Sequence, residues 1–188
     1  IGDIACVGVG QRRLKVVSSP IGKRFRSALV SRVPDTSTRQ LGYEFRADGR
    51  WRLYAFADAD GTAVAELADW LEKSDDSPVA QFTPEGTDID SVFDVKVIYQ
   101  QPYSDIDLAQ VPRYFLPKVG PYQLIDYEKI YAAHPDDDIF EALEIDRSGA
   151  LVIQRPDMYV AHVLPLSVRE EITEFFARSM VRQHNTVR

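Results

Sequence analysis

The sequence predicts an α/β fold in which a mixed β-sheet carries helices on both faces. In some segments apolar residues recur at helical spacing. Short apolar runs typical of strands alternate with these segments along the chain. Over residues 48–182 the expected order is strand, helix, strand, helix, strand, strand, helix. The chain has 188 residues, of which 45% are hydrophobic and 27% are charged. This length and this composition are typical of one globular domain.

The first strand is expected after the turn signal Asp48-Gly49, with Arg50 leading into the run Trp51–Ala57. Both sides of this run are apolar, since Tyr54 and Phe56 alternate with other apolar residues, so the strand should be buried on two faces. A helix should follow, because the next apolar residues stand at positions i, i+3, i+4 and i+7: Val64, Leu67, Ala68 and Leu71.

Val92–Tyr99 is expected to form the second strand. A long segment then carries four prolines, which disfavour regular structure. This segment includes the aromatic run Tyr114-Phe115-Leu116 and the motif Asp126–Tyr131, and irregular backbone with short helical turns is expected for both. The four prolines are Pro102, Pro112, Pro117 and Pro121.

The last part of the chain predicts a short helix over Ile139–Leu143 and then a hairpin over residues 151–163. The turn Arg155-Pro156-Asp157 connects its strands, because proline presets the first turn position and aspartate suits the second. Ser167 and Glu170 have the spacing of a capping box at the start of a final helix. The apolar face of this helix would consist of Val168, Ile172, Phe175, Phe176 and Met180.

Residues 1–47 are expected to form an extended basic arm that links the domain to an upstream one, and residues 183–188 a C-terminal tail. Glycines and prolines interrupt the arm, leaving short strands at Leu14–Val17 and Ala28–Val33. Residues 1–52 hold eleven Lys and Arg but only four acids, although the net charge of the chain is −7. We expect the arm to lie across an acidic surface, its own or a partner's, and Arg24 and Arg26 to help it dock. Nucleic acid is not expected as a partner, since the acidic remainder would repel phosphate.

A β-α-β unit followed by a β-β-α unit is the thioredoxin arrangement, so a thioredoxin-like fold is predicted. In that fold, thiol chemistry occurs where the first strand enters the first helix. The residues there are Ala57-Asp58-Ala59-Asp60, which contain no sulfur and suit helix capping. Ser148-Gly149-Ala150 occupies the place of the proline that precedes the third strand in thioredoxins. Thiol–disulfide exchange is therefore excluded.

Other candidate sites favour structural roles, so no catalytic, cofactor-binding or metal-binding residue is predicted. The single cysteine, Cys6, suits a small buried hydrophobic residue. The pair Gly8 and Gly10 lacks the third glycine of a dinucleotide loop. Consecutive acids at Asp136–Asp138 suit a loop and helix start better than a metal site. The three histidines are scattered and have no ligand spacing: His134, His162 and His184.

The chain is expected to be cytoplasmic and not bound to a membrane. No apolar run approaches the roughly 18 residues that a spanning helix needs, and no signal segment is recognisable. The first residue is Ile1, and the methionines are Met158 and Met180. A chain without an initiator is expected to be either processed or cut from a longer protein.

Three segments resemble the C-terminal domain of flavin-dependent aromatic-ring hydroxylases of the phenol 2-monooxygenase and 3-hydroxybenzoate 4-monooxygenase type. They are residues 47–58 (ADGRWRLYAFAD), 126–131 (DYEKIY) and 149–166 (GALVIQRPDMYVAHVLPL). The similarity extends from about Ile21 to Phe176. The motifs include Asp48, Gly49, Arg50 and Trp51 in the first segment and Arg155, Pro156 and Asp157 in the third.

The resemblance implies a thioredoxin-like domain without redox cysteines, which agrees with the fold predicted from the residues. It also implies upstream domains of the same chain that bind FAD and NADPH and hydroxylate a phenol or hydroxybenzoate with O2. In such enzymes the C-terminal domain is associated with dimerisation, so a homodimer and a structural role are expected. No catalytic residue can be carried over.

Two alternatives differ in class. One is a free-standing thioredoxin-like module that binds a small aromatic ligand or a protein partner; the other is an inactive thioredoxin relative in redox signalling. Aromatic residues of the proline-marked segment would line the pocket of the first, although clustered aromatics more often pack a subsidiary core. These residues are Tyr103, Tyr114, Phe115, Tyr122, Tyr127 and Tyr131.

Overall fold

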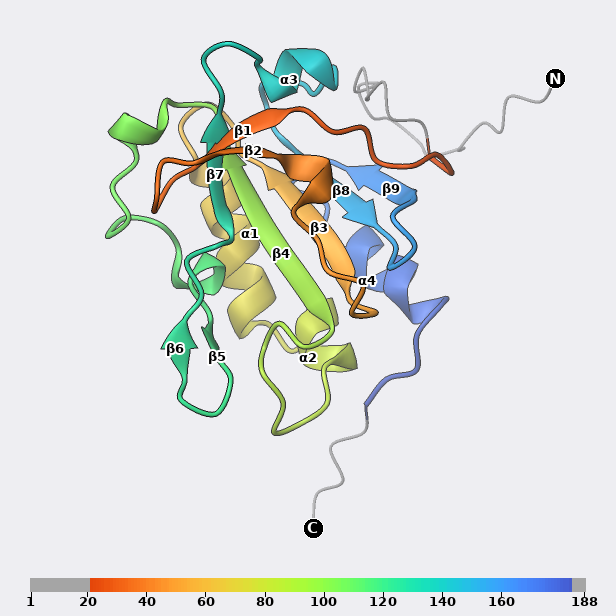
Figure 1. Cartoon of the computed structure of the whole chain (residues 1–188). Helices are drawn as coiled ribbons and strands as arrows, with labels where there is room; N and C mark the ends of the chain where they lie inside the picture. The colour runs from red at the N-terminus through yellow and green to blue at the C-terminus, as the bar shows by residue number, and fades with distance from the viewer. Residues whose placement is uncertain (1–20, 184–188) are drawn as a thin grey trace, which may run out of the picture.

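A mixed seven-stranded sheet runs through the centre of the computed structural model, which describes residues 21–183 (Figure 1). Its strand order is β2-β1-β7-β4-β3-β8-β9, and a separate hairpin pairs β5 with β6. The strands are β1 (Leu29–Arg32), β2 (Thr38–Gln40), β3 (Trp51–Phe56), β4 (Phe93–Tyr99), β5 (Lys118–Val119), β6 (Leu124–Ile125), β7 (Ile130–Ala133), β8 (Ala150–Gln154) and β9 (Val160–Leu164).

The predicted α/β core is confirmed. Strands β3 and β4 are parallel and are joined through α1 (Thr62–Lys73), while β8 pairs antiparallel with β3 and β9 pairs antiparallel with β8. The predicted apolar face of α1 is buried against the sheet. A right-handed crossover through a helix is the usual way to connect two parallel strands.

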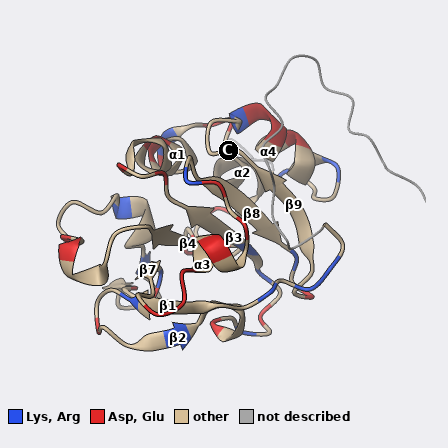
Figure 2. Cartoon of the chain, turned by 90° about the horizontal axis from the view of Figure 1, so that it is seen from above, with Lys and Arg blue, Asp and Glu red and all other residues tan. Residues whose placement is uncertain are grey.

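Helices cover both faces of the sheet. On one face α1, α2 (Pro78–Phe82) and α4 (Arg169–Ala177) share a core with Leu53 and Ala55 of β3. On the other face α3 (Ile139–Ala142) packs with Tyr54 and Phe56 of the same strand. Figure 2 shows α1, α2 and α4 together on one side of the sheet and α3 on the opposite side. Strand β3 is therefore buried on both faces, as its sequence predicts.

Three short 3-10 helices complete the described elements: η1 (Leu41–Tyr43), η2 (Tyr103–Asp105) and η3 (Arg113–Phe115). The last two lie in the proline-marked segment, where short helical turns are predicted. None of the helices within residues 21–183 is long and apolar enough to cross a bilayer.

Strand β7 differs from the prediction, which expects irregular backbone around it. It pairs parallel with β4 and antiparallel with β1, and thereby occupies the interior of the sheet. Ile130, Tyr131 and Ala132 are buried. The strand has four residues and follows a proline-marked loop, so its sequence pattern is too short to distinguish it from that loop.

The N-terminal segment also differs from the expected arm. The strand predicted over Ala28–Val33 is present as β1, but β1 and β2 extend the main sheet through β7. Leu29–Arg32 and Thr38–Gln40 therefore belong to the sheet. Pairing between residues about 100 positions apart gives no local signal in the sequence. The strand predicted at Leu14–Val17 lies outside the described residues, as do Cys6, Gly8, Gly10 and His184.

The predicted capping box at the final helix is wrong. Helix α4 begins at Arg169, with Val168 at its cap position and no side-chain hydrogen bond there. Ser167 lies instead in the preceding turn, in which Val168 N donates to Pro165 O at 3.3 Å. The apolar face of the helix is confirmed, since Ile172 and Phe176 are buried in the core.

Candidate functional site

The junction between β3 and α1 is the place where a thioredoxin would carry its thiols. Here the Asp58 carboxylate accepts hydrogen bonds from Ala63 N at 3.0 Å and Val64 N at 3.1 Å. Asp60 Oδ1 accepts from Thr62 N at 3.0 Å. The free N–H groups at the start of α1 are thus satisfied by acids, in the capping role that the sequence predicts.

Gly149 closes the opposite side of the same junction. Its φ is +85°, and an added Cβ would lie 2.6 Å from Leu166 Cδ1 and 2.7 Å from Phe56 O. The glycine therefore packs against the end of β3 without space for a side chain. Asp58 N would also lie only 2.9 Å from that Cβ. Close packing replaces the proline found here in thioredoxins.

A dinucleotide does not fit this helix N-terminus. Pyrophosphate binding needs free N–H groups and benefits from the positive end of the helix dipole. At α1 the N–H groups of Ala63 and Val64 already bond to Asp58, and Asp60 adds a second carboxylate nearby. The residues present would repel a pyrophosphate, so no step of flavin chemistry is assigned to them.

The turn Arg155-Pro156-Asp157 forms the corner of the β8–β9 hairpin. Arg155 N donates to Tyr159 O at 2.9 Å, and Met158 N donates to Arg155 O at 2.9 Å. The Arg155 guanidinium donates to the Asp157 carboxylate. Arg155, Pro156 and Asp157 are exposed and line no pocket with a second functional group, so the geometry assigns them a role in the turn.

The acids and histidines singled out in the sequence make structural contacts. Asp138 Oδ1 accepts from Phe140 N at the start of α3, and Asp137 Oδ2 accepts from Leu29 N. His134 Nε2 lies 3.2 Å from Thr38 Oγ1. The ring of His162 packs edge-on against Phe175. Within residues 21–183 no group of three or more His, Cys, Asp or Glu side chains is placed to hold a metal ion.

The aromatic residues of the proline-marked segment do not come together in one pocket. Tyr114 and Phe115 are buried in the core beneath α1, whereas Tyr131 is buried in the core on the other face of the sheet. Tyr122 is 84% exposed. Tyr103 and Tyr127 are exposed as well. The structure therefore does not assemble the aromatic ligand site of the binding-module alternative.

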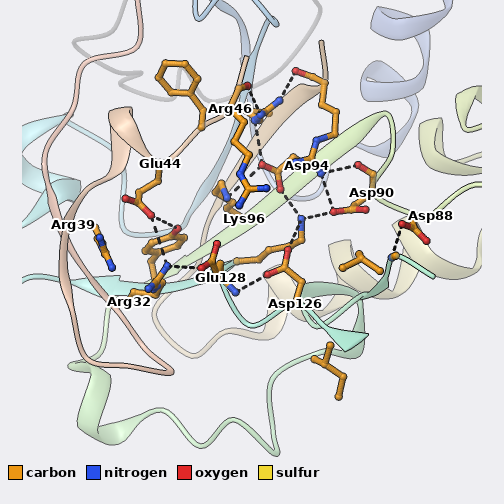
Figure 3. A pocket seen from close by; sticks show the side chains of 18 of the residues that line it. Arg32, Arg39, Glu44, Arg46, Asp88, Asp90, Asp94, Lys96, Asp126 and Glu128 are labelled. Carbon is orange, nitrogen blue, oxygen red and sulfur yellow. Dashed lines mark hydrogen bonds and ion pairs between the residues drawn. The ribbon is translucent and has the colours of Figure 1, made fainter. Parts of the chain in front are cut away.

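A charged pocket that sequence reasoning missed lies at the N-terminal ends of β3 and β4 (Figure 3). Its volume is about 730 Å³, and 13 of its 20 lining residues are charged. The basic residues are Arg32, Arg39, Arg46, Arg50, Arg52, Lys96 and Lys129, and the acidic residues are Glu44, Asp88, Asp90, Asp94, Asp126 and Glu128.

Asp94 stands at the centre of the charged pocket. Its carboxylate lies 2.7 Å from Lys129 Nζ, 3.3 Å from Lys96 Nζ and 3.1 Å from Arg52 Nε. All four side chains are buried, with at most 8% of their surface exposed. Buried charges require partners because desolvation is costly, and this carboxylate has three.

Burial alone would raise the pKa of the Asp94 carboxyl, but the charges of Lys96 and Lys129 outweigh it and hold that pKa below its ordinary value. Burial lowers the pKa of Lys96, whose attraction to Asp94 compensates only in part. For Lys129 the balance reverses. Burial opposes its charge, yet Asp94 and Asp90 raise its pKa above the ordinary value.

The motif around Asp48 forms the outer wall of this ion-pair network. Arg50 bonds to Asp48 and Asp90, both at 2.9 Å. Arg52 Nη1 donates to Asp48 Oδ1 at 2.8 Å, and Arg52 Nη2 donates to Arg46 O at 2.8 Å. The network thereby ties the turn before β3 to the loop before β4. Arg50 and Arg52 thereby contact acids of the chain itself.

The sequence signal for the pocket is a set of charges inside apolar strands. Arg52 pairs in register with Asp94, and Tyr54 with Lys96, so these side chains project from the same face of the sheet. The pocket has no cysteine or serine, and its charges nearly balance. This arrangement of ion pairs cross-links the loops before β3 and β4.

The comparison with protein families decides the identity. The model of the phenol hydroxylase C-terminal dimerisation domain matches residues 10–184. The chain belongs to this family. The curated relatives of this dimerisation domain are much longer proteins. The chain is 46% identical over 171 residues to 3-hydroxybenzoate 4-monooxygenase from Comamonas testosteroni, covering 85% of the chain and 26% of that protein.

A second relative of this dimerisation domain is the FAD-dependent monooxygenase terD from Aspergillus terreus, at 31% identity over 175 residues. The match covers 87% of the chain and 28% of that protein. The dimerisation domain thus spans about a quarter of the length of the curated relatives that it matches.

Solved structures agree with the thioredoxin-like fold of the dimerisation domain. A thiol:disulfide interchange protein from Bacteroides sp. superposes with a TM-score of 0.54 at 10% identity, covering 86% of the chain and 90% of that protein. A thioredoxin-like protein from Bacteroides caccae gives a TM-score of 0.51 at 13% identity, covering 86% and 50%. Identities this low show the fold alone.

Proposed function

We propose that this chain is the C-terminal structural and dimerisation domain of an FAD-dependent aromatic-ring monooxygenase, and that it carries out no redox step by itself. The observation that carries the proposal is the 46% identity to 3-hydroxybenzoate 4-monooxygenase over 85% of the chain. Family membership over residues 10–184 points to the same role, since the family is described by dimerisation.

The β3–α1 junction supports an assembly role. The position of the reactive thiols holds Asp58 and Asp60, and Gly149 is packed against the end of β3. The helix N-terminus is capped by acids, which disfavour both a thiolate and a bound pyrophosphate. The features that this junction leaves for an assembly role are a sheet with a hydrophobic core on each face and a network of ion pairs that joins its loops.

In this proposal the flavin and the substrate belong to upstream domains of the same protein, and residues 1–47 include the linker to them. The parent reaction is the hydroxylation of a phenol or hydroxybenzoate with O2 and NADPH, in the cytoplasm. Two copies of the whole protein form a homodimer. Arg24, whose guanidinium donates to Met158 Sδ beside the β8–β9 turn, and Arg26 help to dock the linker.

The proposal is tested by asking which part of the protein binds flavin. The purified chain, titrated with FAD, should leave the flavin fluorescence unquenched and should not oxidise NADPH in the presence of phenol or 3-hydroxybenzoate. The open reading frame upstream of Ile1 should encode a G-x-G-x-x-G strand–helix unit. Bound flavin or turnover in the chain alone would overturn the proposal, and so would a start codon close upstream.

A further inference from the structure

The rim of the charged pocket carries unusually exposed apolar side chains. Tyr43 of η1 is 74% exposed, and Leu124 and Ile125 of β6 are 67% and 41% exposed. All three line the pocket. Tyr122 and Tyr127 flank β6 and are also exposed, so five of the nine exposed large hydrophobic residues within 21–183 lie in this region. Clusters of exposed apolar side chains rimmed by polar residues are typical of interaction sites.

The β5–β6 hairpin that bears part of this rim is held in a fixed position. Gly120 N donates to Asp88 Oδ2 at 2.8 Å, and Asp126 N donates to Pro117 O at 2.8 Å. A two-stranded hairpin with both faces exposed is marginally stable in water. The rim is thus anchored to the loop before β4 through Asp88 and exposed to solvent.

At the floor of the pocket, two basic side chains have hydrogen-bond donors that are not fully used. Lys96 is buried, but Asp94 is the one carboxylate within 4 Å of its Nζ among the described residues, at 3.3 Å. The neighbouring Lys129 has three carboxylates within that distance: Asp90, Asp94 and Asp126. Arg52 Nε has no well-aligned hydrogen bond. Lys96 Nζ therefore keeps donor capacity that the described carboxylates do not fill, whereas Arg52 Nε is buried against Asp94.

We propose that this face, the charged pocket with its rim of Tyr43, Leu124 and Ile125, is the surface through which two copies of the chain pair. The inference rests on the proposed function and adds the location of the dimer contact. In a twofold interface the same patch meets itself, so it must be apolar or must carry both signs of charge. This pocket carries seven basic and six acidic residues, which allows each sign to face the other across the axis.

The helical face on the other side of the sheet does not meet this requirement. Helices α1 and α4 carry six acidic residues against Lys73 and Arg169. Pairing this face with its own copy would bring like charges together and so disfavour the complex. Figure 2 shows the acidic start of α4 on the side of the sheet away from β1 and β2. The acids are Glu66, Asp69, Glu72, Glu170, Glu171 and Glu174.

The test uses two matched pairs of substitutions in the chain, studied by sedimentation velocity over a range of concentrations. Tyr43→Arg and Leu124→Arg place a charge on the rim. Tyr159→Arg, at the β8–β9 turn, and Val181→Arg, beyond α4, place the same charge on exposed apolar residues elsewhere. The rim variants should raise the dimer dissociation constant at least about tenfold, and the controls should change it less than about twofold. Far-ultraviolet circular dichroism checks that all four variants are folded.

The outcomes separate the two proposals. A dimeric chain whose rim variants dissociate selectively supports the assigned surface. A dimeric chain whose rim variants stay dimeric, or whose controls dissociate equally, overturns the surface and leaves the proposed function standing. A monomeric unsubstituted chain at all concentrations overturns both, because no pairing then exists to be located.

Discussion

The Nζ atom of Lys129 lies 2.7 Å from Oδ1 of Asp94, and both side chains are almost completely buried. The same Nζ atom lies 2.7 Å from Asp90 Oδ2, so one lysine joins the loop before β4 to the strand itself. Buried ion pairs contribute little net stability when complete, but removing one partner leaves an uncompensated charge. The loss of unfolding free energy on removing a lysine therefore depends on how many carboxylates it leaves without a partner. On this basis Lys129 and Lys96 should differ.

Lys129→Met should lower the free energy of unfolding by about 3 kcal/mol, because it removes the shared cation of Asp90 and Asp94. Lys96→Met should lower it by about 1 kcal/mol or less, since burial already disfavours the charge of Lys96 and only Asp94 pairs with it. Urea denaturation followed by tryptophan fluorescence measures both. An equal decrease in the free energy of unfolding in the two variants would contradict this prediction. It would show that Asp90 and Asp94 do not depend on Lys129 as their shared cation.

Asp94→Asn should destabilise the chain in a manner that depends on pH. The folded pKa of Asp94 is depressed, so its ionised form contributes stability above the unfolded value of about 3.9, and this contribution is lost as pH falls through the folded pKa. The difference in unfolding free energy between the original chain and the variant should be constant above about pH 5 and shrink below about pH 4. Denaturation curves at several pH values measure it. A difference that grows on acidification would contradict the assigned direction.

Gly149→Ala should cost about 3 kcal/mol, because the glycine has a positive φ and the new Cβ would collide with Leu166 and with Phe56 O. Gly86→Ala is the matched control. Gly86 has a similar φ of +78° but nothing within 4 Å, so its loss should be about 1 kcal/mol. Thermal unfolding of both variants compares the costs. A tolerated Gly149→Ala would mean that the β3–α1 junction has room for a ligand.

The core could be predicted from the sequence where local patterns are strong. Trp51–Phe56 is apolar on both faces, and Val64, Leu67 and Leu71 follow helical spacing, so β3 and α1 are recognisable without any neighbour. Strand β7 was not recognisable, because four residues beside a proline-marked loop look like that loop. Its burial depends on β4 and β1, which are distant in sequence.

The charged pocket escaped prediction for a related reason. Arg52 and Asp94 are charges inside otherwise apolar strands, but the sequence does not show that they meet each other and Lys129. That depends on strand register and on the return of the chain beside β4. The capping box failed differently. Ser167 and Glu170 have the correct spacing, but after the turn at Pro165 helix α4 begins at Arg169, one residue later than a helix capped by Ser167 would.

Sedimentation equilibrium of the unsubstituted chain tests the central claim most directly. The account predicts a mass twice that of one chain at high concentration, with reversible dissociation on dilution. A mass equal to one chain at every concentration would contradict it, since a domain whose task is to join two subunits must bind its own copy.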